Sequence, residues 1–158
     1  MSKLSRPRQQ GRWLIGVQVF LLAAAVAAQD GIAPAVPKIV AFEDVQFAPP
    51  NMAPSAQMRV LSGQPATGPS AMYLRFVKQS IPLHLHTADY HLLVVEGQMK
   101  HWSRGESEAD ARLLGPGSYW YQPGGQVHAD ACVSDSCLLY LVWSGPRDGR
   151  PAPAEAPR

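Results

Sequence analysis

The most informative stretches of the chain are Pro82-Leu83-His84-Leu85-His86 and Pro123-Gly124-Gly125-Gln126-Val127-His128. The chain has five histidines, and three of them lie in these two places. His84 and His86 are two residues apart in an alternating run, so in a strand their imidazoles leave one face, with Cβ atoms roughly 6–7 Å apart. The Pro-Gly-Gly turn reverses the chain before His128 and could return a third imidazole to the same place. Together the stretches predict a metal site inside a β-barrel.

A His-x-His pair alone is weak evidence for a metal, because two histidines on one strand face often form only a polar surface. The second stretch adds a fixed spacing, in which Gly117, Pro123, Gly125 and His128 are separated by five, one and two residues. A chance match to both patterns is improbable in a chain of 158 residues. We therefore expect the three histidines of these stretches to share one ion.

Residues 1–28 have the pattern of a secretory signal peptide. Four basic residues precede an apolar stretch, Trp13 to Ala28, that ends in small residues. This stretch is short for a membrane span of about 20 residues, so we expect cleavage after Ala28 rather than an uncleaved anchor. The expected location is outside the cytoplasm, in the periplasm of a bacterium, with no membrane attachment after cleavage.

Removal of the signal changes the charge of the chain. The whole sequence has 14 basic and 12 acidic residues, and the signal takes four basic residues (Lys3, Arg6, Arg8 and Arg12) and no acidic one, which leaves 10 against 12. The mature chain is therefore near −2 and has no basic patch that would suit nucleic acid.

The remaining sequence indicates one all-β domain. We predict a linker at 29–37, a domain at 38–144, and a disordered tail at 145–158 that is rich in Pro, Ala, Gly and Arg. Fifteen prolines and thirteen glycines divide the chain into short segments, which argues against a helical bundle. Strands are expected at residues 39–42, 57–61, 71–77, 90–102, 118–121, 126–132 and 138–143, with the histidine strand between the third and fourth.

These spacings resemble the two sequence motifs of the cupins. The first cupin motif is Gly, five residues, His-x-His, three or four residues, Glu, six residues and Gly; the second is Gly, five residues, Pro-x-Gly, two residues, His, three residues and Asn. The second motif matches from Gly117 to His128, with Cys132 at the Asn position. The resemblance implies a single-domain cupin, a small jelly-roll β-barrel, and possible homodimers, since many cupins pair through exposed strands.

The first motif departs from the family pattern. Lys78 stands at the leading Gly, and no glutamate occupies the fourth ligand position. Counting four residues from His86 places His91 there, whereas counting six residues back from Gly97 places Tyr90 there. We favour the second count, because Val-Val-Glu-Gly at 94–97 anchors the strand and a slip of one residue reverses every face. Tyr90 is then expected to point inward and His91 outward. The run from 86 to 90 also resembles small bacterial cupins of uncharacterised function, the domain of unknown function 4437 type.

The expected cofactor is one divalent transition metal held by His84, His86 and His128. Neutral imidazoles suit Fe, Zn, Mn, Ni or Cu. Cupins with three-histidine sites include iron dioxygenases, so the resemblance implies a metal-dependent dioxygenase acting on a small chelating substrate. The alternatives are a non-catalytic periplasmic ligand-binding or sensing module with a structural metal, and a barrel that no longer holds a metal. Tyr90 could ligate, could donate its hydroxyl to a bound molecule, or could belong only to the barrel wall.

Other polar and aromatic residues support smaller predictions. Cys132 and Cys137 are the only cysteines, and in an exported protein they are expected to form a disulfide, with stabilisation toward the low end of about 2–4 kcal/mol. Asp89 is expected to cap its own turn, with orientation of a histidine ligand as the alternative. His101 is expected at the surface or rim rather than as a ligand. Four aromatic residues are expected in the core, with a pocket lining as the alternative: Tyr119, Trp120, Tyr121 and Trp143.

Overall fold

The computed structural model describes residues 36–48 and 56–154. The predicted signal peptide at 1–28 and nearly all of the predicted linker at 29–37 lie outside the described residues. Within the described ranges, no helix is long and apolar enough to span a membrane.

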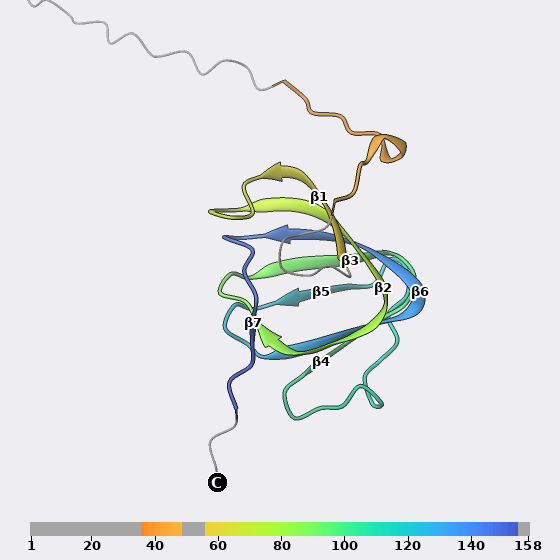
Figure 1. Ribbon diagram of the computed structural model, residues 1–158, viewed down its shortest axis with the longest axis vertical. Coiled ribbons are helices and arrows are strands. Elements are labelled where there is room, and N and C mark those ends of the chain that lie inside the picture. The colour runs from red at the N-terminus through yellow and green to blue at the C-terminus, as the bar shows by residue number, and fades with distance from the viewer. Residues whose placement is uncertain (1–35, 49–55, 155–158) are drawn as a thin grey trace, which may run out of the picture. The chain divides into compact units, whose positions relative to one another are not determined.

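Antiparallel strands are the main regular structure of the described chain (Figure 1). The elements are η1 (Phe42–Asp44), β1 (Ala56–Gly63), β2 (Ser70–Leu85), β3 (Tyr90–Glu96), β4 (Met99–Ser103), β5 (Tyr119–Gln122), β6 (His128–Trp143) and β7 (Arg150–Pro151). The strand predicted at 39–42 is wrong, because this segment has no regular structure before the 3₁₀ turn. Ile39 is 90 % exposed, so the segment has no neighbouring layer against which to bury its apolar side chains.

Two long strands join the two layers of the domain. β2 and β6 have 16 residues each and pair with one another along most of their length. In Figure 1 both curve from the layer that holds β1, β3 and β5 to the layer that holds β4. The last part of β6 pairs with β3, and its first part pairs with β4. The result is the all-β arrangement that the sequence predicts.

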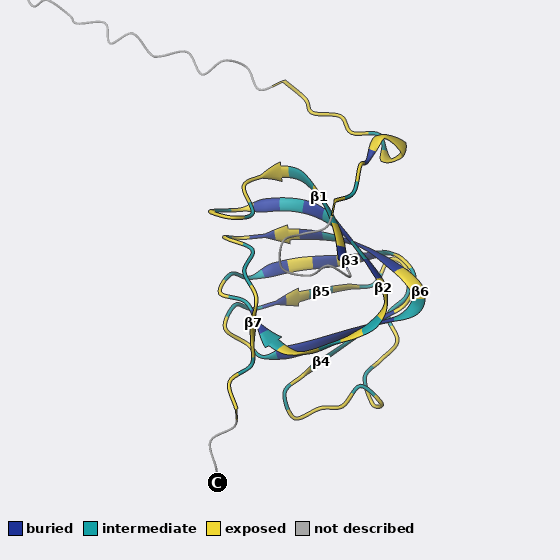
Figure 2. Ribbon diagram, in the orientation of Figure 1, coloured by how far each residue is buried: buried dark blue, intermediate teal, exposed yellow. Residues whose placement is uncertain are grey.

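Buried residues of β2, β3 and β6, dark blue in Figure 2, belong to one hydrophobic core cluster. In β2 the residues Met72, Leu74 and Phe76 are buried, as their alternation predicts. The same cluster contains Leu139 of β6, the neighbouring strand, and Leu92 of β3, the next strand of the sheet. This apolar cluster fills one part of the interior and leaves another part for polar side chains.

Irregular pairing in β2 sets the direction of the two histidines. The register of β2 against β6 shifts between Val77 and Gln79, and again between Ile81 and His84. Across the first shift the inward residues change from even to odd numbers, because Phe76 is buried, Val77 is 55 % exposed and Ile81 packs against the core. Two shifts restore the even residues to the inside, so His84 follows the same face as Phe76. Pro82 lies within the second irregular stretch, where a residue without an N–H is tolerated.

The chain after Ser144 is ordered onto the domain, which corrects the prediction of a disordered tail for residues 145–154. β7 pairs with the end of β2, and the backbone N–H of Ala152 donates to the carbonyl of Leu83 at 3.0 Å. The backbone N–H of Arg147 donates to Pro65 at 2.7 Å. These bonds use the backbone alone, so they leave no periodic pattern in the sequence. Residues 145–152 are called the C-terminal strap below.

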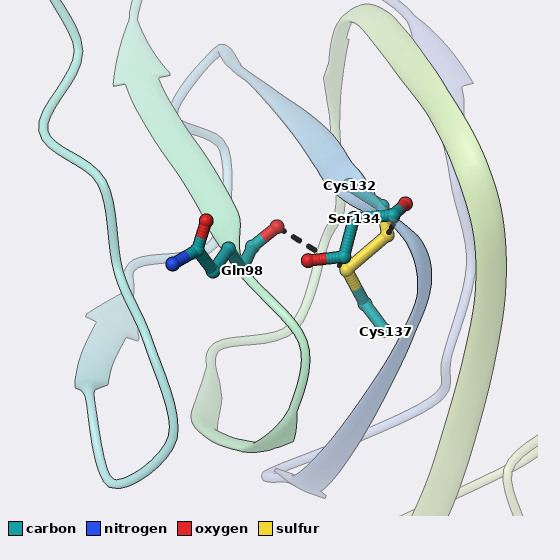
Figure 3. The surroundings of a disulfide bond; sticks show 4 residues. All are labelled: Gln98, Cys132, Ser134 and Cys137. Carbon is teal, nitrogen blue, oxygen red and sulfur yellow. Dashed lines mark hydrogen bonds between the residues drawn. A yellow bond between two sulfur atoms is a disulfide. The ribbon is translucent and has the colours of Figure 1, made fainter.

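The predicted disulfide between Cys132 and Cys137 is present in the structure (Figure 3). It lies within β6, which runs continuously through this bend, rather than between two separate strands as the sequence suggests. The turn between β3 and β4 packs against it, with the carbonyl oxygen of Gln98 3.2 Å from Cys137 Sγ. The disulfide therefore holds the bend at which β6 passes from one layer to the other.

Candidate metal centre

The three histidines predicted from the sequence come together inside the domain. One ligand atom from each of His84, His86 and His128 lies within 4.8 Å of those of the other two. His84 and His128 are direct partners in the pairing of β2 with β6, and their ring centroids are 4.3 Å apart. The predicted convergence of three imidazoles from two segments is confirmed.

The Pro-Gly-Gly turn brings His128 to the other two histidines by packing on the loop that follows β2. The backbone N–H of Gly125 donates to the carbonyl of His86 at 2.7 Å. A Cβ on Gly124 would lie 2.3 Å from the carbonyl oxygen of Thr87, so this close approach requires glycine. The Pro-Gly-Gly turn is therefore hydrogen-bonded directly to His86, the residue that follows β2.

A backbone carbonyl fixes the tautomer of each of the three histidines. His84 Nδ1 lies 2.8 Å from the carbonyl of Pro82, and His128 Nδ1 lies 3.0 Å from that of Gln126. His86 Nδ1 bonds to the carbonyl of Asp148 in the C-terminal strap. Because a carbonyl only accepts, each Nδ1 carries the hydrogen, and in the neutral ring each Nε2 keeps a free lone pair. Outer hydrogen bonds of this type orient imidazoles that ligate metals.

Burial keeps two of these imidazoles neutral. His128 is 1 % exposed, and burial lowers its pKa. Burial also lowers the pKa of His86 to about 4, opposed in part by its hydrogen bond to Asp148. Metal ions bind the neutral imidazole, so these two rings are in the ligating form at neutral pH. The donor set and its orientation fit a divalent transition metal.

Tyr90 and His91 lie on opposite faces of β3, as the favoured register predicts. Tyr90 is 3 % exposed, and its hydroxyl donates to the free Nε2 of His128 at 3.2 Å. Burial raises the pKa of Tyr90, with a further rise from the charge of Asp130, which favours the protonated phenol. His91 is exposed and bonds to the hydroxyl of Tyr119 on the outer face. Tyr90 therefore reaches the histidine cluster, and His91 points away from it.

Asp130 also faces the histidine cluster, and the sequence analysis missed it. Its Oδ2 lies 3.8 Å from His84 Nε2 and 3.9 Å from His128 Nε2. Both distances are too long for a hydrogen bond, so space remains between the carboxylate and the two nitrogens. A signal was available, because Asp130 is two residues beyond His128 and therefore shares its strand face.

His101 lies deeper than the surface or rim position predicted for it. Its Nδ1 bonds to Asp130 Oδ1 at 2.7 Å, and its ring stacks on Trp120 with centroids 4.9 Å apart. Pairing of β4 with β6 sets His101 opposite Asp130, so the two side chains meet. His101 thereby holds one carboxylate oxygen and leaves the other facing the histidines.

The four aromatic residues of the prediction divide between the two faces of the sheet. Trp143 is 2 % exposed and stacks at an angle on Tyr90, as expected for the core. Tyr119 and Tyr121 are 57 % and 47 % exposed, so the prediction that they line the core or a pocket is wrong. β5 is the last strand of the sheet and pairs with β3, and Tyr119 and Tyr121 lie on its solvent-exposed face.

Asp89 does not cap its own turn. Its Oδ1 accepts a hydrogen bond from the backbone N–H of Gly124 at 2.7 Å. Its backbone carbonyl accepts a hydrogen bond from the backbone N–H of Ser144 at 3.0 Å. The carboxylate thus joins the loop after β2 to the Pro-Gly-Gly turn. It positions His128 through the backbone and does not contact a histidine ring.

A cavity of about 460 Å³ opens beside the histidines. This volume is in the range of small-molecule sites. Its wall includes His84, His86 and Tyr90, apolar side chains of β2, β3 and β6, and residues 147–151 of the C-terminal strap. The cavity therefore connects the histidine cluster with space for a small molecule.

Comparison with known protein families assigns the chain to one family. Residues 39–155 match the family described as "Domain of unknown function (DUF4437)". The match covers most of the chain, and the protein belongs to this family. A comparison with curated proteins finds no sequence match.

Solved structures define the fold as cupin-like. An RmlC-like cupin from Shewanella frigidimarina aligns over 72 % of this chain and 95 % of its own, with 17 % identity and a TM-score of 0.56. The polyketide cyclase RemF from Streptomyces resistomycificus aligns over 76 % and 88 %, with 21 % identity and a TM-score of 0.60. The DMSP lyase DddQ from Ruegeria pomeroyi aligns over 70 % and 53 %, with 20 % identity and a TM-score of 0.50. At these identities the likeness concerns the fold, and the predicted all-β cupin barrel is confirmed.

Proposed function

We propose that this protein is a metal-dependent enzyme in which His84, His86 and His128 hold one divalent transition metal next to a small chelating substrate. The observation that carries the proposal is the fixed tautomer of all three rings, in which each Nδ1 is bonded to a backbone carbonyl. Free imidazoles on a polar surface would have no reason to share this orientation. A transition metal requires neutral imidazoles that converge on one point, and burial keeps His86 and His128 in this form within the three-histidine cluster.

The residues around the cluster suit proton transfer to and from a bound molecule. When bound, the metal would polarise an oxygen of the substrate or bind dioxygen at an open position. Tyr90 keeps its proton and can donate a hydrogen bond at the cluster. Asp130 presents one carboxylate oxygen to the same space while His101 holds the other, so it can accept a proton.

Two kinds of reaction remain within this proposal. The resemblance to three-histidine cupins favours oxidation of the substrate by dioxygen. Among the cupin-like structures, a polyketide cyclase and a DMSP lyase support the use of this barrel for enzyme chemistry of other kinds. Oxygen uptake by Fe(II)-loaded protein with diketone or thiol candidates tests the first kind, and turnover without oxygen uptake in the Zn(II)- or Ni(II)-loaded protein supports the second.

Metal binding is the part of the proposal that can be tested without a substrate. Competition with a chromophoric chelator should give one tight site per chain in the natural protein, and loss of this site in His128→Ala. His91→Ala is the matched control, because His91 lies on the outer face, and it should bind metal normally. Tight metal binding with no turnover on any candidate would favour a ligand-binding or sensing module, and metal binding that survives in His128→Ala would refute the assigned ligands.

We also propose that the protein acts outside the cytoplasm. The signal-like pattern at 1–28 and the disulfide between Cys132 and Cys137 support this location, since disulfides persist in oxidising compartments. Fractionation of bacterial cells that express the full chain should recover a shortened, oxidised protein in the periplasm. Recovery of a full-length protein from the cytoplasm would contradict it.

A further inference from the structure

The wall of the cavity contains an arginine without an acceptor. Arg147 lies in the C-terminal strap and lines the cavity together with His86. Its Nε is buried and has no hydrogen-bond partner, and no ion pair joins its guanidinium to any residue of the described part of the chain. Burial lowers the pKa of Arg147, but a guanidinium still keeps its charge at neutral pH. A buried donor or charge without a partner is costly.

The nearby carboxylates do not serve as counter-ions for Arg147. Asp148 accepts from the backbone N–H of Thr87 at 2.8 Å and from its hydroxyl at 2.9 Å. Asp130 is engaged by His101 and faces the histidine cluster. Each carboxylate that lines the cavity therefore has another partner, and the guanidinium is left for a group that comes from outside.

The charge of the whole cavity favours the same conclusion. Its charged lining residues are two arginines and two aspartates, namely Arg147, Arg150, Asp130 and Asp148, which cancel. Since His86 and His128 are held neutral, a divalent ion on the histidines would leave the cavity cationic. An anionic molecule would reduce this charge.

Most of the remaining wall is apolar, apart from Gln79, Ser80 and Tyr90. Leu74, Phe76, Leu92, Leu139 and Leu141 line the cavity behind the histidines. A molecule that fills about 460 Å³ would place its apolar part on these side chains. The lining therefore combines an arginine, a set of apolar side chains and two of the three histidines.

We propose that the cavity binds a small organic carboxylate, whose carboxylate group pairs with Arg147 and whose apolar part lies along the leucine-rich wall beside the metal. This carboxylate would be the substrate class of the proposed enzyme, and the role given to the metal rests on the proposed function. The pairing with Arg147 does not depend on the metal. A guanidinium binds a carboxylate with two parallel hydrogen bonds, which an amide of the same shape cannot reproduce.

Benzoate and benzamide are matched probes for this site, because they share size and shape and differ in charge. Isothermal titration of the full mature protein, with and without Zn(II), should show benzoate binding at least tenfold tighter than benzamide. Arg147→Gln should weaken benzoate about tenfold and leave benzamide unchanged. Arg147→Lys should weaken benzoate less, because it keeps the charge and loses the forked geometry.

Arg59→Gln is the control for loss of a positive charge, because Arg59 is exposed on β1 and does not line the cavity. It should leave both affinities unchanged. Thermal unfolding of each variant tells a folding defect from a binding defect. If benzoate does not bind, if it binds no better than benzamide, or if Arg147→Gln leaves its affinity unchanged while the fold is intact, the inference is wrong. The metal content of the same samples tests the proposed function separately, since the metal-free protein must still prefer benzoate.

Discussion

The ring of His86 donates its Nδ1 hydrogen to the backbone carbonyl of Asp148, 62 residues further along the chain. This bond makes the C-terminal strap part of the candidate metal centre, because it orients the ring and fixes its tautomer. The strap is itself held by the carboxylate of Asp148, which accepts two hydrogen bonds from Thr87. The segment that the composition of the sequence assigns to a disordered tail thus completes the site.

Asp148→Ala should weaken metal binding without removing a ligand. The substitution releases the strap from Thr87, and the carbonyl that orients His86 loses its fixed position. Loss of outer-shell partners of this kind costs about 10–100-fold in metal affinity. A chelator competition titration measures the change, with Asp135→Ala on the exposed part of β6 as control. Equal affinities for the two variants would show that the strap does not position the histidine.

Tyr90→Phe should keep the metal and impair turnover. Its hydroxyl is a hydrogen-bond donor at the cluster and not a charged ligand, because burial raises its pKa. Loss of a proton donor in such a site lowers kcat by about 10²–10⁴-fold. His91→Ala, one residue away on the outer face, should change neither metal content nor rate. If Tyr90→Phe instead loses the metal, Tyr90 is a ligand.

Asp130→Asn should also keep the metal while it lowers kcat. The amide cannot accept a proton from a bound molecule, and the three imidazoles remain in place. A loss of about 10²-fold or more in kcat, with KM nearly constant, is expected. Asp110→Asn, in the exposed loop that follows β4, serves as the control. An unaltered rate in Asp130→Asn would exclude the proposed role of this carboxylate.

Gly97→Ala should destabilise the domain by more than Gly105→Ala. Both glycines have positive φ angles, 81° and 92°, so alanine is strained at either position. At Gly97 the new Cβ would also lie 2.4 Å from the carbonyl oxygen of Ser136, next to the disulfide, whereas at Gly105 it would meet nothing within 4 Å. We expect a loss of about 1 kcal/mol at Gly105 and at least about 2 kcal/mol at Gly97. Denaturant unfolding gives both free-energy losses. Equal losses would show that the backbone around Gly97 and Ser136 shifts at little cost to make room for the new Cβ.

The histidines could be predicted from the sequence because their signal is local. His84 and His86 are two residues apart and therefore share a strand face. The Pro-Gly-Gly turn before His128 predicts that the chain reverses and brings this third imidazole back to them. Tyr90 and His91 could be assigned because alternation in β3 is regular. The sequence does not reveal the two irregular pairings of β2 with β6. Their effects on which face points inward cancel, and a single one would have turned His84 outward.

Two parts of the site could not be read from the sequence in this way, for different reasons. Asp130 lies on the same face as His128, so the pattern contained it, but no motif draws attention to a carboxylate at this position. The role of Arg147 and Asp148 depends on backbone hydrogen bonds between the strap and β2, which carry no side-chain periodicity. Such contacts between distant segments are fixed by the tertiary structure alone.

The three-histidine metal centre can be observed by X-ray absorption spectroscopy of the zinc-loaded protein. The spectrum should show three imidazole nitrogens at about 2.0–2.1 Å from the metal and no sulfur ligand, and imidazole scattering should be lost in His128→Ala. A spectrum without imidazole scattering, or one that is the same in His128→Ala, would contradict a metal centre built from His84, His86 and His128.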